Sequence, residues 1–257
     1  MLSRAKRHTR EVSRSVLDWM EERTSLVSMT EKFLYEPVPK KGKWIYTLGS
    51  ATLFLITLQF LTGILLLFYY VPTTDHAWDS IYYMMTQVYF GQFIRGVHFW
   101  SANILVVVVG LHMLRTFFAG AYKGPREMNW IVGVFLIFLV TFLAFSGYAL
   151  RWDQEGFWAW EVGVKISSYS PFIGDWMILS LLGGDTIGPA TLSRVFALHV
   201  WVMPALLAPL TGFHLFLLRK HGEFGTKYEY SRRLAKMREQ RQFEELSKSS
   251  ENGEGHE

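Results

Sequence analysis

Four long stretches without a charged side chain constrain this chain more than any other feature. They cover residues 44–74, 96–114, 128–150 and 195–218, and all four are rich in Leu, Val, Ile and Phe. A helix of about 20 apolar residues crosses the roughly 30 Å hydrocarbon core of a membrane. Because backbone polar groups in lipid must bond within their own segment, these stretches predict an all-α bundle of four transmembrane helices.

The remaining segments predict the domain organisation. Residues 1–43 form a basic, amphipathic segment with a surface helix, residues 44–225 the transmembrane domain, and residues 226–257 a charged tail with a disordered end. The apolar run from Trp176 to Gly184 is too short to span and predicts a surface helix between the third and fourth stretches. The Arg- and Ser-rich residues 1–15 leave a mitochondrial transit peptide as an alternative reading of the start.

The Lys and Arg residues predict the orientation in the membrane. Of the 26, 10 precede the first stretch, 9 lie between Arg219 and Lys248, and 2, Lys123 and Arg126, lie between the second and third stretches. By the positive-inside rule, both termini and that loop are cytoplasmic, so the second and fourth helices run parallel. The net charge of +4 therefore indicates membrane topology, and no nucleic-acid partner is expected.

Four of the eight histidines lie inside the predicted spans, where a polar side chain is costly. His98 and His112 are 14 residues apart on the second helix, a rise of about 21 Å, and His199 and His214 are 15 apart on the fourth. On parallel helices, His98 can meet His199 at the outer level and His112 can meet His214 at the inner level. The chain has no cysteine, so each facing pair favours a non-covalent b-type haem. Hydrogen bonding between helices is the alternative for any one histidine alone.

Glycines and cations accompany the histidines. Gly49 and Gly63 in the first stretch, and Gly133 and Gly147 in the third, are each 14 residues apart. We interpret them as places where helix backbones approach the two haems, with helix packing as the alternative. Four cations at the ends of the spans are predicted to pair with haem propionates, with snorkelling to water as the alternative: Arg95, Arg115, Arg219 and Lys220.

Several motifs are more specific than the spacing. They are residues 18–23 (Asp-Trp-Met-Glu-Glu-Arg), 94–98 (Ile-Arg-Gly-Val-His), 123–127 (Lys-Gly-Pro-Arg-Glu), 146–148 (Ser-Gly-Tyr), 152–154 (Trp-Asp-Gln) and 219–222 (Arg-Lys-His-Gly). Through them, roughly residues 16–225 resemble the cytochrome b family of quinol-oxidising complexes, and in particular its split, cytochrome b6-like branch.

The resemblance implies an electron-transfer subunit of a quinol:acceptor oxidoreductase, coupled to proton translocation. A low-potential haem is implied at the outer level and a higher-potential haem at the inner level. Quinol is oxidised at an outer site, one electron passing to a Rieske iron–sulfur protein and onward to a cytochrome c or similar acceptor, the other to an inner quinone. The implied complex is a homodimer in a bacterial cytoplasmic membrane. His221 is a candidate proton donor to the inner quinone, and a solvated loop histidine is the alternative.

Three departures from the family pattern matter. The Pro-Glu-Trp-Tyr tetrapeptide is absent and is expected on a separate three-helix subunit. Thr47 stands where the branch has the cysteine that holds an extra haem, so no thioether-linked haem is expected. Arg151 replaces the proline that usually precedes Trp-Asp-Gln. Two other functions stay open: a di-haem anchor of another quinone-linked oxidoreductase, and a haem-free transporter that relays protons.

Overall fold

The computed structural model describes residues 18–19, 21–25, 44–221, 240 and 242. The chain divides into two units, Met1–Lys43 and Trp44–Glu257. In the first unit, residues 18–19 and 21–24 are helical, and the Arg23 guanidinium lies 4.9 Å from the centre of the Trp19 ring. Most of the predicted N-terminal segment and of the predicted tail 226–257 lies outside the described residues.

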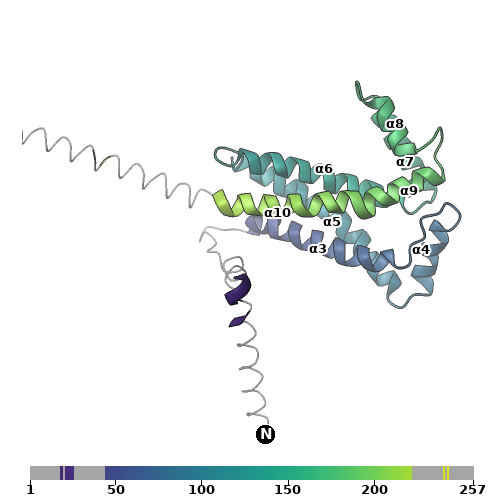
Figure 1. Cartoon of the computed structure of the whole chain (residues 1–257), viewed down its shortest axis with the longest axis horizontal. Coiled ribbons are helices and arrows are strands. Elements are labelled where there is room, and N and C mark those ends of the chain that lie inside the picture. Colours follow the sequence, from purple (N-terminus) through teal and green to yellow (C-terminus); the bar gives the residue numbers. More distant parts are fainter. Residues whose placement is uncertain (1–17, 20, 26–43, 222–239, 241, 243–257) are drawn as a thin grey trace, which may run out of the picture. The chain divides into compact units, whose positions relative to one another are not determined.

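Four helices of the second unit are long and apolar enough to cross a membrane, which confirms the predicted count. The first consists of η1 (Trp44–Thr47) and α3 (Leu48–Leu67), the second is α5 (Gly91–Phe118), and the third is α6 (Glu127–Ala149). The fourth joins α9 (Pro189–Ala197), η2 (Leu198–Val202) and α10 (Met203–His221). In Figure 1, α3, α5, α6 and α10 lie side by side as one bundle, and the described part of the chain contains no strand.

The ends of the helices differ from the ends of the uncharged stretches. The first helix stops at Leu67 rather than at residue 74, because Pro72 disfavours helical backbone at the residue before it and has no N–H to donate. The second helix begins at Gly91 rather than at 96 and includes Arg95. A charge marks where hydrocarbon ends, whereas a helix can continue into the hydrated interface beyond it.

Three shorter helices gather at one end of the bundle (Figure 1): α4 (Ala77–Thr86), α7 (Gln154–Ser168) and α8 (Gly174–Leu182). The predicted short helix between the third and fourth spans corresponds to α8, whereas α4 and α7 were not predicted. The buried Trp160 fixes α7 to the bundle, since its ring stacks on Phe145 of α6 at 5.2 Å. Arg194 donates to the carbonyls of Leu179 and Ser180 at the end of α8.

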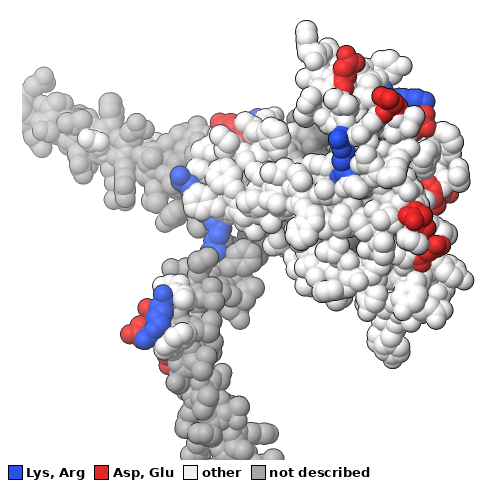
Figure 2. Space-filling model, turned by 45° about the vertical axis from the view of Figure 1, so that its right-hand side comes forward, with Lys and Arg blue, Asp and Glu red and all other residues white. Residues whose placement is uncertain are grey.

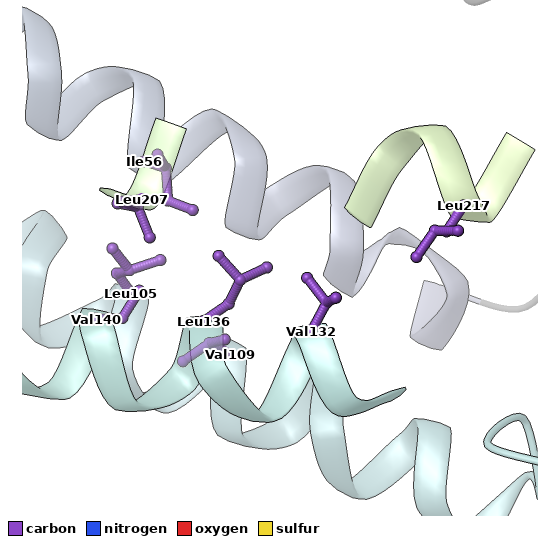
Figure 3. Close-up of a cluster of buried hydrophobic side chains, with 8 residues drawn as sticks. All are labelled: Ile56, Leu105, Val109, Val132, Leu136, Val140, Leu207 and Leu217. Carbon is purple, nitrogen blue, oxygen red and sulfur yellow. The ribbon is translucent and has the colours of Figure 1, made fainter. Parts of the chain in front are cut away.

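Buried apolar side chains from all four spans form the core of the bundle (Figure 3). Leu105 lies between the two histidines of α5, and Leu207 lies between those of the fourth span. Six of the eight members of this layer therefore lie between the outer and inner histidine levels, whereas Val132 and Leu217 lie at or beyond the inner level. The members of the layer are Ile56, Leu105, Val109, Val132, Leu136, Val140, Leu207 and Leu217.

The helices of the bundle are not equally close to one another. α3 packs on α5, α5 on α6, and α6 on α10, whereas α5 and α10 make few close backbone approaches. Gln59 links α3 to α5, because its amide donates to the His98 carbonyl at 2.9 Å and to the Ser101 hydroxyl at 2.6 Å. The two histidine-bearing helices are thus linked mainly through their neighbours rather than by close approach of their backbones.

Charged side chains divide between the two ends of the bundle. Figure 2 shows acidic side chains gathered toward the end that carries α4 and α7. Residues 68–90 and 150–188, at this end, include seven Asp and Glu residues but only two Lys and Arg residues. The described cations at the opposite end are Lys123, Arg126, Arg219 and Lys220. The two ends of the bundle therefore differ in charge, the property on which the positive-inside rule depends.

Candidate functional site: two histidine pairs

His98 of α5 and His199 of η2 face each other at the end of the bundle near α4 and α7. Their ring centres are 6.5 Å apart and the ring planes are inclined by 74°. An imidazole nitrogen binds a transition metal at about 2.0–2.1 Å, so a metal held between two opposed rings places the ring centres about 6 Å apart. The outer pair therefore has the separation that two axial ligands of one metal require.

Hydroxyl groups select the tautomer of both outer histidines. The Thr62 hydroxyl lies 2.8 Å from His98 Nδ1 and 2.6 Å from the Leu58 carbonyl. The Ser146 hydroxyl lies 3.0 Å from His199 Nδ1 and 3.1 Å from the Leu143 carbonyl. A carbonyl only accepts and a hydroxyl has one proton, so both contacts are satisfied only when Nδ1–H donates to the hydroxyl oxygen. Nε2 then keeps its lone pair for a metal.

His112 of α5 and His214 of α10 form the inner pair. The two rings lie close enough to interact electrostatically. The His214 ring faces the backbone carbonyl of Asn129, and its Nδ1 makes no hydrogen bond of good geometry. The structure thus brings together the same two pairs of histidines that the sequence predicts.

Each of the four predicted glycines faces one histidine. A Cβ atom would lie 3.1 Å from His112 Cε1 at Gly49, 3.3 Å from His98 Cε1 at Gly63, 3.4 Å from His214 Cε1 at Gly133, and 2.7 Å from His199 Cε1 at Gly147. Cβ contacts of this kind are short for carbon atoms, which are in best contact at about 3.5–4.0 Å. The missing side chains therefore make room for the imidazoles themselves, which is more specific than the predicted approach to a cofactor.

A single π-helical turn, η2, contains His199. A π turn accommodates one more residue than an α turn, and such turns occur often at functional sites. The 15-residue interval from His199 to His214 thereby matches the 14-residue interval from His98 to His112. The two intervals are unequal in the sequence, and the π turn is the local structure that reconciles them.

The predicted cations lie at the two ends of the bundle. Arg95 is partly buried, and Arg151 and Asp153 are near enough to act on it electrostatically. Arg115 lies over the Tyr46 ring at 4.4 Å. Lys220 is exposed, whereas Arg219 and His221 are partly buried at the end of α10.

Arg151 forms a charged cluster at the outer end that the sequence did not predict. Its guanidinium is 2.7 Å from Glu155, 3.2 Å from Asp153 and 4.2 Å from the centre of the Tyr148 ring. Burial alone lowers the pKa of Arg151, but the hydrogen bond to Glu155 and the charge of Asp153 outweigh it and raise this pKa. Asp153 also caps α7, since it accepts from the Gly156 amide at 2.8 Å.

We expect Arg151→Gln to raise the pKa of Glu155 toward its ordinary value. The hydrogen bonds from Arg151 and Tyr148 lower the pKa of Glu155. Their stabilisation of the cluster is therefore fully present at a pH above the ordinary pKa of glutamate, and it is lost as the pH falls through the lowered pKa. In Arg151→Gln the loss begins at a higher pH. Infrared or ¹³C NMR titration of the glutamate carboxyls measures this. Lys165→Gln, which removes the partner of Glu161, is the matched control, and an unchanged Glu155 titration in Arg151→Gln contradicts the assignment.

The inner end carries buried polar atoms that the sequence reasoning missed. Arg126 Nε and Nη1, Asn129 Oδ1 and Thr211 Oγ1 are buried and have no hydrogen-bond partner within the described residues. Such atoms are costly unless a bound group or water pairs with them. A cavity of about 690 Å³ lies at the same end, between the start of the first span and the end of α5, lined by residues that include Trp44, Tyr46, Leu111, Arg115 and Phe118.

The described residues contain no group of three or more His, Asp or Glu side chains that could hold a metal ion. Facing pairs of nitrogen ligands, one pair at each of two depths, instead suit a planar cofactor that supplies its own equatorial ligands. The 6.5 Å separation, the Nδ1–H tautomers and the unpaired inner polar atoms all fit b-type haem. The fold and the two facing histidine pairs are thus those expected of the class of multi-pass membrane cytochromes.

The chain belongs to the cytochrome b/b6 family, since the family description "Cytochrome b/b6/petB" matches residues 33–222. It is 41% identical over 219 residues to the menaquinol:cytochrome c reductase cytochrome b subunit of Bacillus subtilis (strain 168), covering 82% of this chain and 97% of the relative. It is 39% identical over 213 residues to cytochrome b6 of Synechococcus sp. (strain CC9311), covering 83% and 98%. These matches confirm the predicted family and its split, cytochrome b6-like branch.

A solved structure titled "Hyperthermophilic respiratory Complex III" contains a chain with the same fold. The TM-score is 0.73 and the identity is 32%, covering 80% of this chain. This chain spans about half of that longer chain, 55% of its length. The longer chain therefore has residues without a counterpart here.

Proposed function

We propose that the chain is the di-haem cytochrome b subunit of a quinol-oxidising complex, and that it conducts electrons from an outer to an inner site. The observation that carries this proposal is the facing of two histidine pairs at two depths. His98 and His199 would hold the outer haem, and His112 and His214 the inner one. A haem held by two histidines would supply outer-sphere electron transfer, because both protein ligand positions on its iron would be filled.

The chain's own residues set the conditions for that transfer. The apolar layer around Leu105 and Leu207 excludes water between the two levels. Arg95 would pair with propionates at the outer boundary, and Arg115 and Arg219 would do so at the inner boundary. Moving an electron inward opposes the membrane potential by about 2.3 kcal/mol per 100 mV for a full crossing. The outer haem must therefore have the lower potential.

The inner cavity supports a quinone site. Its volume of about 690 Å³ lies within the range of small-molecule pockets, and its aromatic lining beside Arg115 suits an apolar ring with polar oxygens. His221, at the end of α10, is the proposed proton donor to the reduced quinone. Thr47 lies in η1, at the same inner end of the bundle. No thioether-linked haem is proposed there.

The proposed assembly is a homodimeric complex in a bacterial cytoplasmic membrane, with both termini cytoplasmic. Its partners are a Rieske iron–sulfur protein, a three-helix subunit with the Pro-Glu-Trp-Tyr motif, and a cytochrome c or similar acceptor. The outer quinol site is completed by the three-helix subunit. The acidic outer end and basic inner end support this orientation.

Purification of the complex in mild detergent tests the proposal. We expect a reduced-minus-oxidised spectrum with two b-type haems per chain, together with a Rieske protein and a short three-helix subunit in the same preparation. A colourless chain would overturn the proposal in favour of a proton-relaying transporter. Co-purification of a molybdenum or nickel–iron subunit would instead establish the membrane anchor of another oxidoreductase. A haem-stained band on the denatured chain would contradict the expectation for Thr47.

A further inference from the structure

The outer and inner histidines differ in their ring partners. Thr62 and Ser146, both buried, give each outer histidine a hydroxyl oxygen at Nδ1. Within residues 44–221, no hydroxyl bonds to the ring of either inner histidine; the His214 ring faces the Asn129 carbonyl, but its buried Nδ1 makes no hydrogen bond of good geometry. The two levels therefore share their ligands and glycines but not this second layer of bonding.

The difference follows from one position in each of two helices. The residue before the glycine that faces an outer histidine is Thr62 in α3 and Ser146 in α6, whereas at the inner level the residues before Gly49 and Gly133 are apolar, Leu48 and Val132. Each hydroxyl also donates to a carbonyl of its own helix. Its proton is therefore already directed away from the ring, and its oxygen is oriented to accept.

We propose that Thr62 and Ser146 are positioning residues that lower the reduction potential of the outer haem relative to the inner one. This inference rests on the proposed function. An Nδ1–H that donates to an oxygen fixes the ring orientation and makes the opposite nitrogen a more basic ligand. A more basic ligand stabilises ferric over ferrous iron, and hydrogen bonding to the ligands is one way in which proteins set haem potentials. Well-formed hydroxyl bonds confined to the outer level lower that potential relative to the inner one and so favour inward electron flow.

Redox titration of the b-type absorbance in the purified complex tests this. In Thr62→Val and in Ser146→Ala, we expect the outer haem to become easier to reduce. Loss of one hydrogen bond shifts its oxidised-to-reduced ratio at the wild-type midpoint by about threefold, and the double variant shifts it by about tenfold, which for one electron is about 59 mV. The inner midpoint stays unchanged, and Thr62→Ser, which keeps the hydroxyl, retains the wild-type outer midpoint.

The same helices offer matched controls. The hydroxyls of Thr57 in α3 and Thr141 in α6 bond to the carbonyl four residues earlier and are exposed. Thr57→Val and Thr141→Val therefore remove an equivalent group away from the histidines and should move neither midpoint. Haem content per chain is measured for every variant. If Thr62→Val fails to assemble, the inference is tested by the shifted outer midpoint expected in Ser146→Ala and the unchanged one expected in Thr62→Ser.

Two results would overturn the inference. One is an outer-haem midpoint in Ser146→Ala and Thr62→Val that equals the midpoint in the control variants, although both haems are bound. The other is an equal shift of both haems, which indicates a general change in the bundle rather than a local bond. Failure of the proposed function looks different, because the unaltered chain then shows no b-type absorbance at all.

Discussion

Replacing His199 with leucine removes the low-spin absorbance of the outer haem and leaves that of the inner haem. Leucine fits the apolar interior of the bundle but offers no lone pair to iron, so the outer level keeps only His98. The inner pair, about 21 Å away along α5, keeps both ligands. We expect the low-spin b-type absorbance per chain to fall by half and electron transfer from quinol to the inner haem to stop. Reduced-minus-oxidised and low-temperature EPR spectra of the complex measure both effects.

His76→Leu is the matched control for this variant. His76 is an exposed outer-side histidine that lies 3.4 Å from Asp75 and belongs to neither pair. It should leave both haems and the electron-transfer rate unchanged. Two low-spin haems in His199→Leu would show that η2 does not supply an axial ligand. Loss of the inner haem as well would show that the two levels do not bind independently.

Gly147→Ala has the second-largest expected effect. Its Cβ would lie 2.7 Å from His199 Cε1, closer than carbon atoms approach without displacing one another. His199 must then move, together with its bond to Ser146. Overpacking of this kind costs about 1–3 kcal/mol, which corresponds to a roughly 5- to 150-fold loss of outer-haem affinity. The measurement is haem content per chain during detergent extraction.

The other glycines predict a graded series. Alanine at Gly49, Gly63 and Gly133 would meet its histidine at 3.1, 3.3 and 3.4 Å, so the effects should decrease in that order. Gly110→Ala in α5 and Gly212→Ala in α10 are the controls, because a Cβ there meets nothing within 4 Å. Equal haem retention in Gly147→Ala and Gly110→Ala would show that the glycine does not shape the histidine site.

Much of this architecture could be predicted because it depends on residues close in one helix. A helix that crosses lipid must be long and apolar, so the absence of charge alone predicts four spans. The regular rise of a helix converts the interval between His98 and His112 into two depths. Helix ends were less predictable, since Arg95 lies inside α5 and the first span ends at Leu67. Charge reports the edge of the hydrocarbon and not the last hydrogen-bonded turn.

By itself, the sequence determined the number of spans and which histidines share a level, because these follow from hydropathy and helical rise. Only the tertiary structure decided that each glycine faces one histidine, that a π turn absorbs the extra residue near His199, and that Thr62 and Ser146 bond to the outer rings alone. Such contacts depend on the rotation of one helix against another. That rotation is set by side-chain packing across the whole bundle, which no single segment encodes.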